Sequence, residues 1–326
     1  MRFKAKLVND QLALFLAVVS PISKLQETFT VLYLDEDYVR VSCKTVESGI
    51  TCFAELSQRH LFLEHRIESA ADNVIVCQID LVSLKLALQS VVQGGGNQQQ
   101  TQQRDRRGRG DQPSNNNGNN QSAMQSLLSG QQVVILKLAK RNNMPCLCLE
   151  GRHTSDSDVE VHQAIPVRIM RRTEMQNHLP PQINHPQVQL ELPFDRPIRP
   201  VIDKLKVMGN TVFLEGNMKG DLTIRQDHDG ASMACFYNRL IPRWQDEEDE
   251  NNHAGPNINA SCRVKVDAHK LSTCLQFQQS QLPMTSCLLG MVYNEMLVLH
   301  ILLSPEQLGF FTYYLPVHYL QEEDLG

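Results

Sequence analysis

The strongest constraint on the fold is that the two halves of the chain carry the same order of hydrophobic patterns. Each half starts with a residue-by-residue alternation typical of a half-buried strand, then shows the three- and four-residue spacing of a helix with one buried face. Several strand patterns, a second helix and three more strands follow. In the first half the opening pair is MRFKAKLV and a helix over 10–24; in the second it is VQLELPF and DRPIRPVIDKLKVM.

This repeat predicts an α+β fold with two domains. The strands are joined mostly by short connections, which favours antiparallel sheets with the helices gathered on one face. Two helices per half then give four helices that line one face of a pseudo-two-fold molecule, with the sheets outside. For 326 residues we expect an N-terminal domain over 1–170, a linker over 171–187 that contains proline and histidine, and a C-terminal domain over 188–326.

Two polar segments interrupt the pattern. Residues 93–126 are rich in Gln, Asn and Gly and lack aromatic side chains, so we expect a disordered insert. Residues 243–261 carry an acidic run over 246–250 and are predicted to form a loop.

Composition limits the class of protein. A hydrophobic fraction of 41% supports real cores, and no apolar run is long enough to cross a membrane. The formal net charge is −5, so any nucleic-acid contact must come from local basic faces. The nine cysteines lie mostly in apolar strand patterns, which favours reduced, buried thiols and a nuclear or cytosolic environment.

Motifs for catalysis or for nucleotide binding are absent from the sequence. It has no GxxxxGK[ST] and no GxGxxG, and no nucleophile elbow. Cys146 and Cys148 fit core packing better than a metal site, because no second Cys/His pair follows at zinc-finger spacing. The run Asp227-His228-Asp229-Gly230 is typical of a hairpin turn, and a metal-dependent enzyme that uses it is the less favoured alternative. We therefore expect no enzyme activity, no cofactor and no bound metal.

Cations on the predicted helices are the informative chemistry. Arg196, Arg199 and Lys206 are placed opposite the apolar stripe of the helix that opens the second half, where cations can meet phosphates. The alternative is an ordinary solvated face. Single cations on the other helices are Lys24, Lys85 and Lys270, whereas the first helix is otherwise nearly uncharged. The RDRRGRG tract (104–110) resembles Arg/Gly segments that bind nucleic acid, which leaves binding through this tract as a further alternative.

The opening MRFKAKLV with its helix, and the later IPVRIM and FFTYYLP, resemble the Hus-one subunit of the checkpoint DNA clamp. The resemblance implies a two-domain DNA sliding-clamp fold and a non-catalytic subunit of a heterotrimeric ring that encircles duplex DNA in the nucleus, with a cytoplasmic pool as an option. It implies two sister subunits of the Rad-nine and Rad-one types, an ATP-driven clamp loader, and recruited checkpoint and repair proteins. A homotrimeric replication clamp of the same fold is the nearest alternative.

The resemblance also assigns site residues. The channel-facing cations are expected to be Lys24, Lys85, Arg196, Arg199, Lys206 and Lys270. Subunits of such rings join through edge strands, here expected at about 160–167 (Glu160, Val161, His162, Ala164) and 232–238 (Ser232, Ala234, Phe236). Partner proteins are expected to dock near the linker.

Overall fold

A computed structural model describes most of the chain. The described residues are 1–25, 30–45, 49–96, 133–152, 160–171, 173–174, 178–228, 230–243, 257–280 and 282–320. The Arg/Gly tract and most of the predicted insert and acidic loop lie outside the described residues, so the expectations made for them remain predictions.

The first half contains three helices and nine strands among its described residues. In chain order they are β1 (Arg2–Leu7), α1 (Asn9–Ser23), β2 (Thr30–Leu34), β3 (Tyr38–Lys44), β4 (Thr51–Ser57), α2 (Gln58–Leu61), β5 (Glu64–Glu68), β6 (Ile75–Ile79), α3 (Leu81–Gly96), β7 (Val133–Arg141), β8 (Met144–Arg152) and β9 (Glu160–Met170), which closes this half.

The second half repeats the order, with shorter helices. Its elements are β10 (Val188–Glu191), α6 (Arg199–Leu205), β11 (Thr211–Asn217), β12 (Leu222–His228), β13 (Ala231–Tyr237), β14 (Ile241–Pro242), β15 (Ser261–Asp267), α7 (Ala268–Cys274), η2 (Leu275–Gln279), β16 (Met284–Val292), β17 (Met296–Leu303), η3 (Glu306–Leu308) and β18 (Gly309–Pro316).

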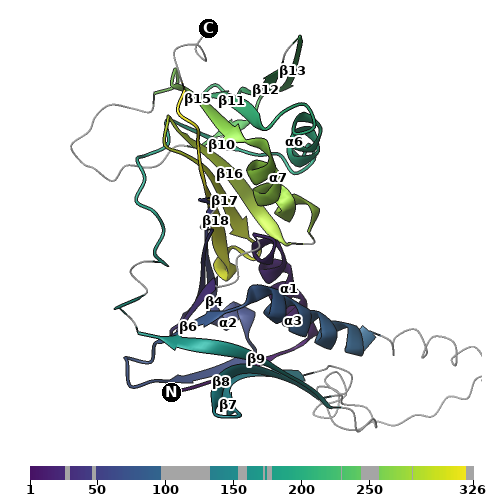
Figure 1. The fold of residues 1–326 in the computed structure, drawn as a ribbon, viewed down its shortest axis with the longest axis vertical. Helices are drawn as coiled ribbons and strands as arrows, with labels where there is room; N and C mark the ends of the chain where they lie inside the picture. Colours follow the sequence, from purple (N-terminus) through teal and green to yellow (C-terminus); the bar gives the residue numbers. More distant parts are fainter. Residues whose placement is uncertain are drawn as a thin grey trace, which may run out of the picture.

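One antiparallel sheet runs through both halves. Its fourteen strands have the order β14-β10-β16-β17-β18-β4-β3-β2-β6-β9-β8-β7-β1-β5. The halves join where β18 pairs with β4, from Gly309 opposite Leu56 to Tyr314 opposite Thr51. A second sheet, β13-β12-β11-β15, closes the end of the second half. Figure 1 shows the two halves stacked along this continuous sheet.

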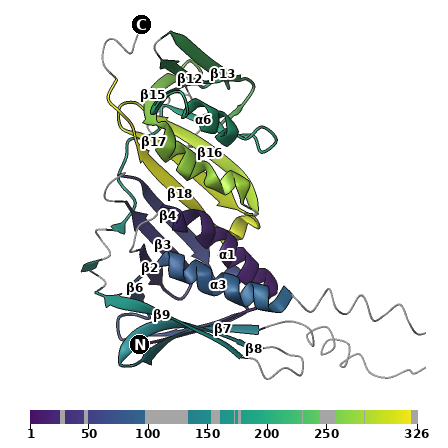
Figure 2. The ribbon, with the colours of Figure 1, turned by 45° about the vertical axis from the view of Figure 1, so that its right-hand side comes forward.

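The longer helices lie together on one side of the sheet. α1 packs against α3 and α6 against α7, and in Figure 2 the two pairs follow one another along the same side. The α+β fold with four helices on one face is thereby confirmed. Beneath the helices, Phe277 packs edge-on against Phe311 with ring centroids 5.9 Å apart, and both rings are buried.

Helix ends follow from local polar contacts. The main-chain N–H of Val8 donates to Oε1 of Gln11 at 3.2 Å, and α1 begins at Asn9, one residue before the predicted start. Asp80 accepts hydrogen bonds from the N–H of Val82 and from the hydroxyl of Ser83, which fixes the start of α3.

Some boundaries differ from the prediction. α6 begins at Arg199 rather than near 195, because Pro197 and Pro200 leave the preceding residues outside the helical ladder. α3 extends to Gly96, which is four residues into the predicted insert. The sequence patterns also gave no sign of α2, β5 or β14. In the described parts of the chain, no helix is long and apolar enough to span a membrane.

Candidate functional site

Three of the predicted cations come together on the helix side, at the junction of the two halves. Lys24 follows α1, Lys85 belongs to α3 and Arg199 opens α6. Burial lowers the pKa of Lys24, and the positive charges of Lys85 and Arg199 lower it further. The three side chains are therefore within electrostatic reach of one another, although they belong to both halves of the chain.

Asp203 ties the cations of α6 to α7. Its carboxylate accepts hydrogen bonds from Nζ of Lys206 (2.7 Å) and from Oγ of Ser272 (2.6 Å), and Nε of Arg199 lies 3.4 Å from its other oxygen. Burial alone would raise the pKa of Asp203, but the hydrogen bonds from Lys206 and Ser272 and the charges of Lys206 and Arg199 outweigh it and lower the pKa. Arg199 and Lys206 are thus partly neutralised from within the protein.

Arg199 has additional contacts that hold it at the start of α6. Its main-chain N–H donates to Oε1 of Gln278 at 3.1 Å, and its guanidinium contacts the side chain of Gln279. Because η2 supplies both amides, α6 and the segment that follows α7 are joined through this one residue. The guanidinium is oriented by the protein itself rather than left free in solvent.

Two other predicted cations lie elsewhere on this side. Arg196 is not on a helix but in the exposed loop before α6. Its Nε lies 3.9 Å from a carboxylate oxygen of Asp195. The charge of Arg196 also acts on Tyr237, at the end of β13. The placement of Arg196 on the helix was therefore wrong, because proline ends the helical ladder at Arg199. Lys270 lies in the first turn of α7, where its N–H donates to Oδ1 of Asp267.

The helical pattern of α6 also contains a cation that sequence reasoning missed. Lys204 is exposed, unlike the half-buried Lys206 two residues later. The sequence could have predicted this exposure, because Lys204 lies on the side of the helix that faces away from the buried Ile202 and Leu205. In the first half, the exposed residues of α3 include two apolar ones, Val82 (44% exposed) and Leu86 (60% exposed).

Both predicted edges are strands with an unpaired side among the described residues. β13 is the outermost strand of the four-stranded sheet, and Phe236 on it is 69% exposed, beside exposed Ser232 and Ala234. β9 pairs with β8 over Glu160–Pro166, but with β6 only over Val167–Met170. Among the described strands, none pairs with the other side of β9 over Glu160–Pro166.

The side chains on the β9 edge are mainly small or polar. His162 and Ala164 are exposed and Val161 is half-buried, while the side chain of Glu160 lies outside the described residues. His162 is 3.6 Å from a carboxylate oxygen of Glu150 on β8.

The turn between β12 and β13 matches the interpretation of Asp227–Gly230 as a hairpin. His228 pairs with Ala231, and Gly230 has a φ of +82° that favours glycine. Asp227 is engaged by Arg225 at 3.1 Å and by the hydroxyl of Ser232, whereas Asp229 lies outside the described residues. Within the described parts of the chain, no three His, Cys, Asp or Glu residues gather in a way that could hold a metal ion.

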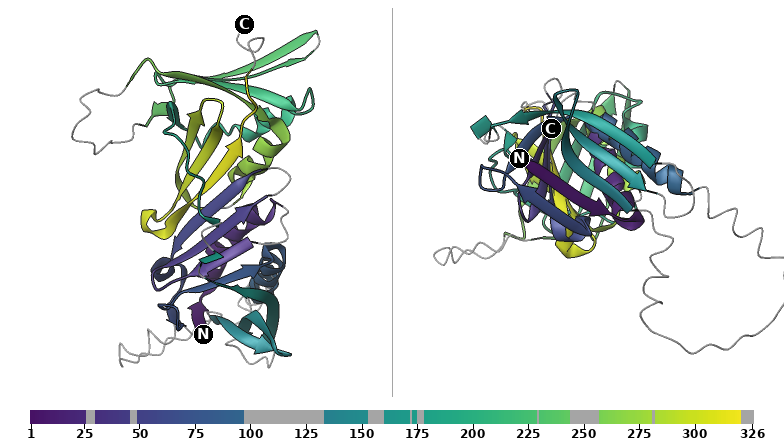
Figure 3. Two further views of the ribbon diagram at one scale, coloured as in Figure 1. Left: turned by 60° about the vertical axis from the view of Figure 1, so that its left-hand side comes forward. Right: turned by 90° about the horizontal axis from the view of Figure 1, so that it is seen from below.

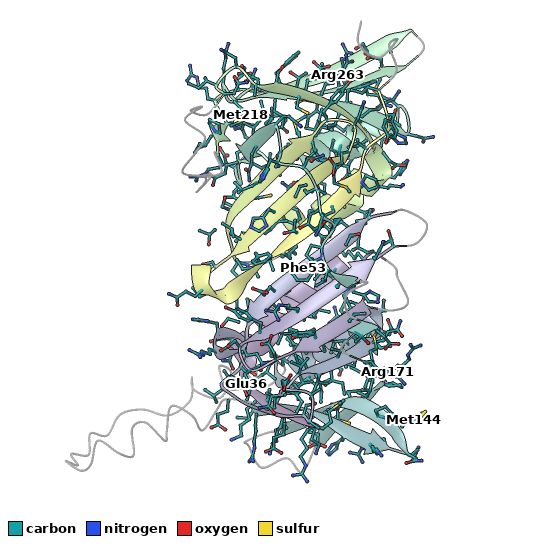
Figure 4. All side chains as sticks on the ribbon, turned by 90° about the vertical axis from the view of Figure 1, so that its left-hand side faces the viewer. Glu36, Phe53, Met144, Arg171, Met218 and Arg263 are labelled. Carbon is teal, nitrogen blue, oxygen red and sulfur yellow. The ribbon has the colours of Figure 1, made fainter. Side chains whose placement is uncertain are left out.

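A groove of about 830 Å³ lies on the opposite, outer face of the second half, beside the linker. Ile183 and Pro186 of the linker form one wall, and Leu288, Phe310 and Tyr314 are on the sheet below. Figure 4 looks onto this outer face, with Phe53 labelled close to the place where β4 and β18 join.

Polar groups at the groove give it a specific chemistry. Arg243 donates through Nε to Glu191 at 2.9 Å, and Nδ1 of His300 lies 2.7 Å from the hydroxyl of Thr312. Burial lowers the pKa of His300. Ser42 of β3 donates to the main-chain oxygen of His178 at 2.5 Å, so the linker is fixed on the outer face of both halves.

The fold is that of the DNA sliding clamps. A solved proliferating cell nuclear antigen (PCNA) from Entamoeba histolytica superimposes with a TM-score of 0.64 at 11% identity, over 97% of this chain and 99% of that one. PCNA from A. fulgidus, solved with the C-terminal region of FEN-1 bound, gives 0.60 at 10% identity, over 98% and 100%. These likenesses establish the fold.

The family follows from the sequence comparisons. A family model described as Hus1-like protein matches residues 1–318, and the chain belongs to that family. Checkpoint protein HUS1 of Homo sapiens is 24% identical over 319 residues, which cover 95% of this chain and 98% of the relative. The checkpoint protein hus1 homolog of Dictyostelium discoideum is also 24% identical, over 97% and 98%.

Family and fold together distinguish between a checkpoint clamp subunit and a homotrimeric replication clamp. The chain is a checkpoint clamp subunit that acts with sister subunits in a multimeric clamp, and the homotrimeric replication clamp is disfavoured. The resemblance noted in the sequence is confirmed over nearly the whole chain.

Proposed function

We propose that this chain is a non-catalytic subunit of a heterotrimeric ring that encircles duplex DNA, and that it acts in the nucleus as a recruitment platform. The observation that carries the proposal is the arrangement of two unlike strand edges with the helix face between them. β13 belongs to the far end of the second half and the free part of β9 to the first half. Two edges that differ in sequence suit head-to-tail contacts, in which each edge of the chain takes a different neighbour.

The weak basic character of the helix face is consistent with encirclement. Lys24, Lys85 and Arg199 supply charge near the junction of the halves, but Asp203 offsets part of it. A closed ring needs only modest, sequence-independent attraction to phosphates, because the DNA leaves only when the ring opens. We assign Lys206, Lys270 and Arg196 to the same contact with DNA.

The partners proposed for the two edges are sister subunits of the Rad-nine and Rad-one types, and an ATP-driven loader opens and closes the ring. The groove beside the linker offers apolar side chains together with the Glu191–Arg243 pair. We propose that this groove receives peptide segments of checkpoint and repair proteins.

The test is the mass of the full chain in solution, alone and co-expressed with candidate sister subunits. We expect a species near 37.0 kDa alone and a 1:1:1 assembly with both sisters. Phe236→Glu places a charge on the β13 edge and should remove one sister from the assembly. Val207→Glu is the matched control, because Val207 is 83% exposed and lies just after α6, on neither edge strand.

Two outcomes would contradict the proposal. A stable self-trimer, near three times 37.0 kDa, would indicate a ring of the replication type. A monomer that binds neither sister would exclude the heterotrimer, and deletion of 94–126 would then test whether the Arg/Gly tract carries nucleic-acid binding.

A further inference from the structure

The first strand carries cations on the outer face of the first half, away from the helices. Arg2, Lys4 and Lys6 alternate with the buried Phe3, Ala5 and Leu7, so the three cations project from the solvent side of β1. In Figure 3, the view from below shows β1 in purple, beside the teal strands of the same sheet. The proposed encirclement of DNA assigns no role to these cations.

The sheet places further cations directly beside Lys4. In the register of the sheet, Lys4 pairs with Arg66 of β5 on one side and with Lys137 of β7 on the other. Directly opposed residues share a face of the sheet, about 4.5–5.5 Å apart, and like charges there destabilise the pairing. A row of three cations across three strands is therefore unfavourable for folding alone, and a bound anionic group would offset its repulsion.

Carboxylates on this face balance the outer members of the row but not its centre. Glu64 is 2.7 Å from Lys6, Glu68 contacts Arg66, and Glu150 is 2.7 Å from Lys137. The hydrogen bond from Lys137 lowers the pKa of Glu150. Within the described part of the chain, Lys4 is exposed and forms no ion pair, so the face keeps an excess of positive charge at its middle.

The shape of the face limits what it can bind. Outward positions on β5, β1 and β7 carry no aromatic ring on which a base could stack, which disfavours single-stranded nucleic acid. The helices are on the other side of the sheet, so a duplex held against them cannot also lie here. An extended peptide does fit, because its alternate side chains repeat at the spacing of the cations on β1, roughly 6.8 Å for two residues.

We propose that this outer face is a docking surface for an extended acidic segment of a partner protein, with carboxylates at alternate residues that meet Arg2, Lys4 and Lys6. Lys4 is the central contact, since it is the cation of the row without an ion pair in the described part of the chain, whereas Arg66 and Lys137 are paired with Glu68 and Glu150. The negative charge of the segment would also relieve the repulsion within the row. This surface is distinct from both strand edges and from the groove beside the linker.

The experiment uses the full chain and a fluorescent ten-residue peptide with glutamate at alternate positions and serine between them. We expect fluorescence anisotropy at low salt to detect binding that Lys4→Glu weakens about tenfold, because attraction at the centre becomes repulsion. The same variant should raise the thermal midpoint by roughly 2–4 °C, because the introduced carboxylate pairs with both cationic neighbours. Lys219→Glu, at an exposed turn of the second half, makes the same change in net charge and should leave both measurements unchanged.

Three results would overturn the proposal. The first is that the peptide does not bind the wild-type chain, and the second is that it binds wild type and Lys4→Glu equally. The third is that a twenty-residue dT oligonucleotide binds more tightly than the peptide and loses its binding in Lys4→Glu, which would identify a nucleic-acid surface. All three can be read on the isolated chain, so they are independent of ring assembly.

Discussion

At the scale of single residues, Asp203 sets how much positive charge α6 offers to DNA. We predict that Asp203→Asn frees Arg199 and Lys206, because the carboxylate that engages both is lost. The salt dependence of DNA binding by the assembled clamp should steepen by up to about 0.9 for each freed cation. The free energy of unfolding should fall by about 1–2 kcal/mol, since charged hydrogen bonds to α7 are weakened.

The matched control for this variant is Asp37→Asn. Asp37 forms an exposed ion pair with Arg59 and lies in the turn between β2 and β3, off the helix face. Asp37→Asn should leave the salt dependence of DNA binding unchanged. An Asp203→Asn clamp with the wild-type salt dependence would show that the two cations do not contact DNA.

His300 predicts a loss of stability in mild acid. Burial lowers its pKa below the ordinary value of 6.5, so the unfolded chain binds a proton more readily than the folded one. Stability is therefore complete above about pH 6.5 and falls as the pH drops toward the folded pKa of His300. His300→Gln should flatten the decline in unfolding free energy between pH 7 and pH 5, measured by urea titration.

Part of the decline should remain in that variant, because burial also lowers the pKa of His178. His269→Gln replaces an exposed histidine of α7 and is the control. A His300→Gln variant whose pH dependence matches that of the wild type would exclude His300 as the titrating group.

At the scale of elements, hydrophobic periodicity predicted most helices and strands because their buried faces are regular. The missed elements lack that signal: β5 has a single well-buried residue, Ile67, and β14 is only two residues long. The pairing of β18 with β4 is a long-range register that local periodicity does not contain. The closeness of Lys24 to Arg199 depends on the same pairing of β18 with β4. Both residues could therefore be predicted as channel-facing cations from the sequence, but their proximity could not.

That junction predicts a strong effect at Gly309. Its φ is +133°, and a Cβ there would lie 2.0 Å from the main-chain oxygen of Glu55 on β4. We expect Gly309→Ala to lower the free energy of unfolding by about 3–5 kcal/mol, because β18 must shift away from β4. Gly230→Ala, with a φ of +82° but nothing within 4 Å, should cost only about 1 kcal/mol in the same denaturant titration.

A small effect of Gly309→Ala, equal to that of Gly230→Ala, would mean that the two halves are not held together at this pair of strands. The difference between the two variants measures the clash with β4 together with the greater backbone strain at Gly309, whose ψ of −158° places it in a region that is essentially restricted to glycine.

At the scale of the whole molecule, one sheet and one helix face give the chain a direction. The free part of β9 belongs to the first half and β13 to the second, and the residues on them differ in size and exposure. A chain with two unlike edges associates head to tail, and such contacts close into a ring when the rotation allows it. Whether the ring contains like or unlike subunits then depends on how well the two edges match each other.

Blocking one edge at a time distinguishes these cases. Ala164→Arg places a long cation on the exposed β9 edge, and Phe236→Glu places a carboxylate on the β13 edge. In a heterotrimer each variant should lose a different sister in co-purification and keep the other, while the double variant loses both. In a self-associating ring the two single variants would behave alike, and mixing them would restore one contact and give dimers. The masses to measure are those of each single variant with the sisters, of the double variant with the sisters, and of the two single variants mixed together. They decide both which edge each sister occupies and whether the edges fit unlike neighbours.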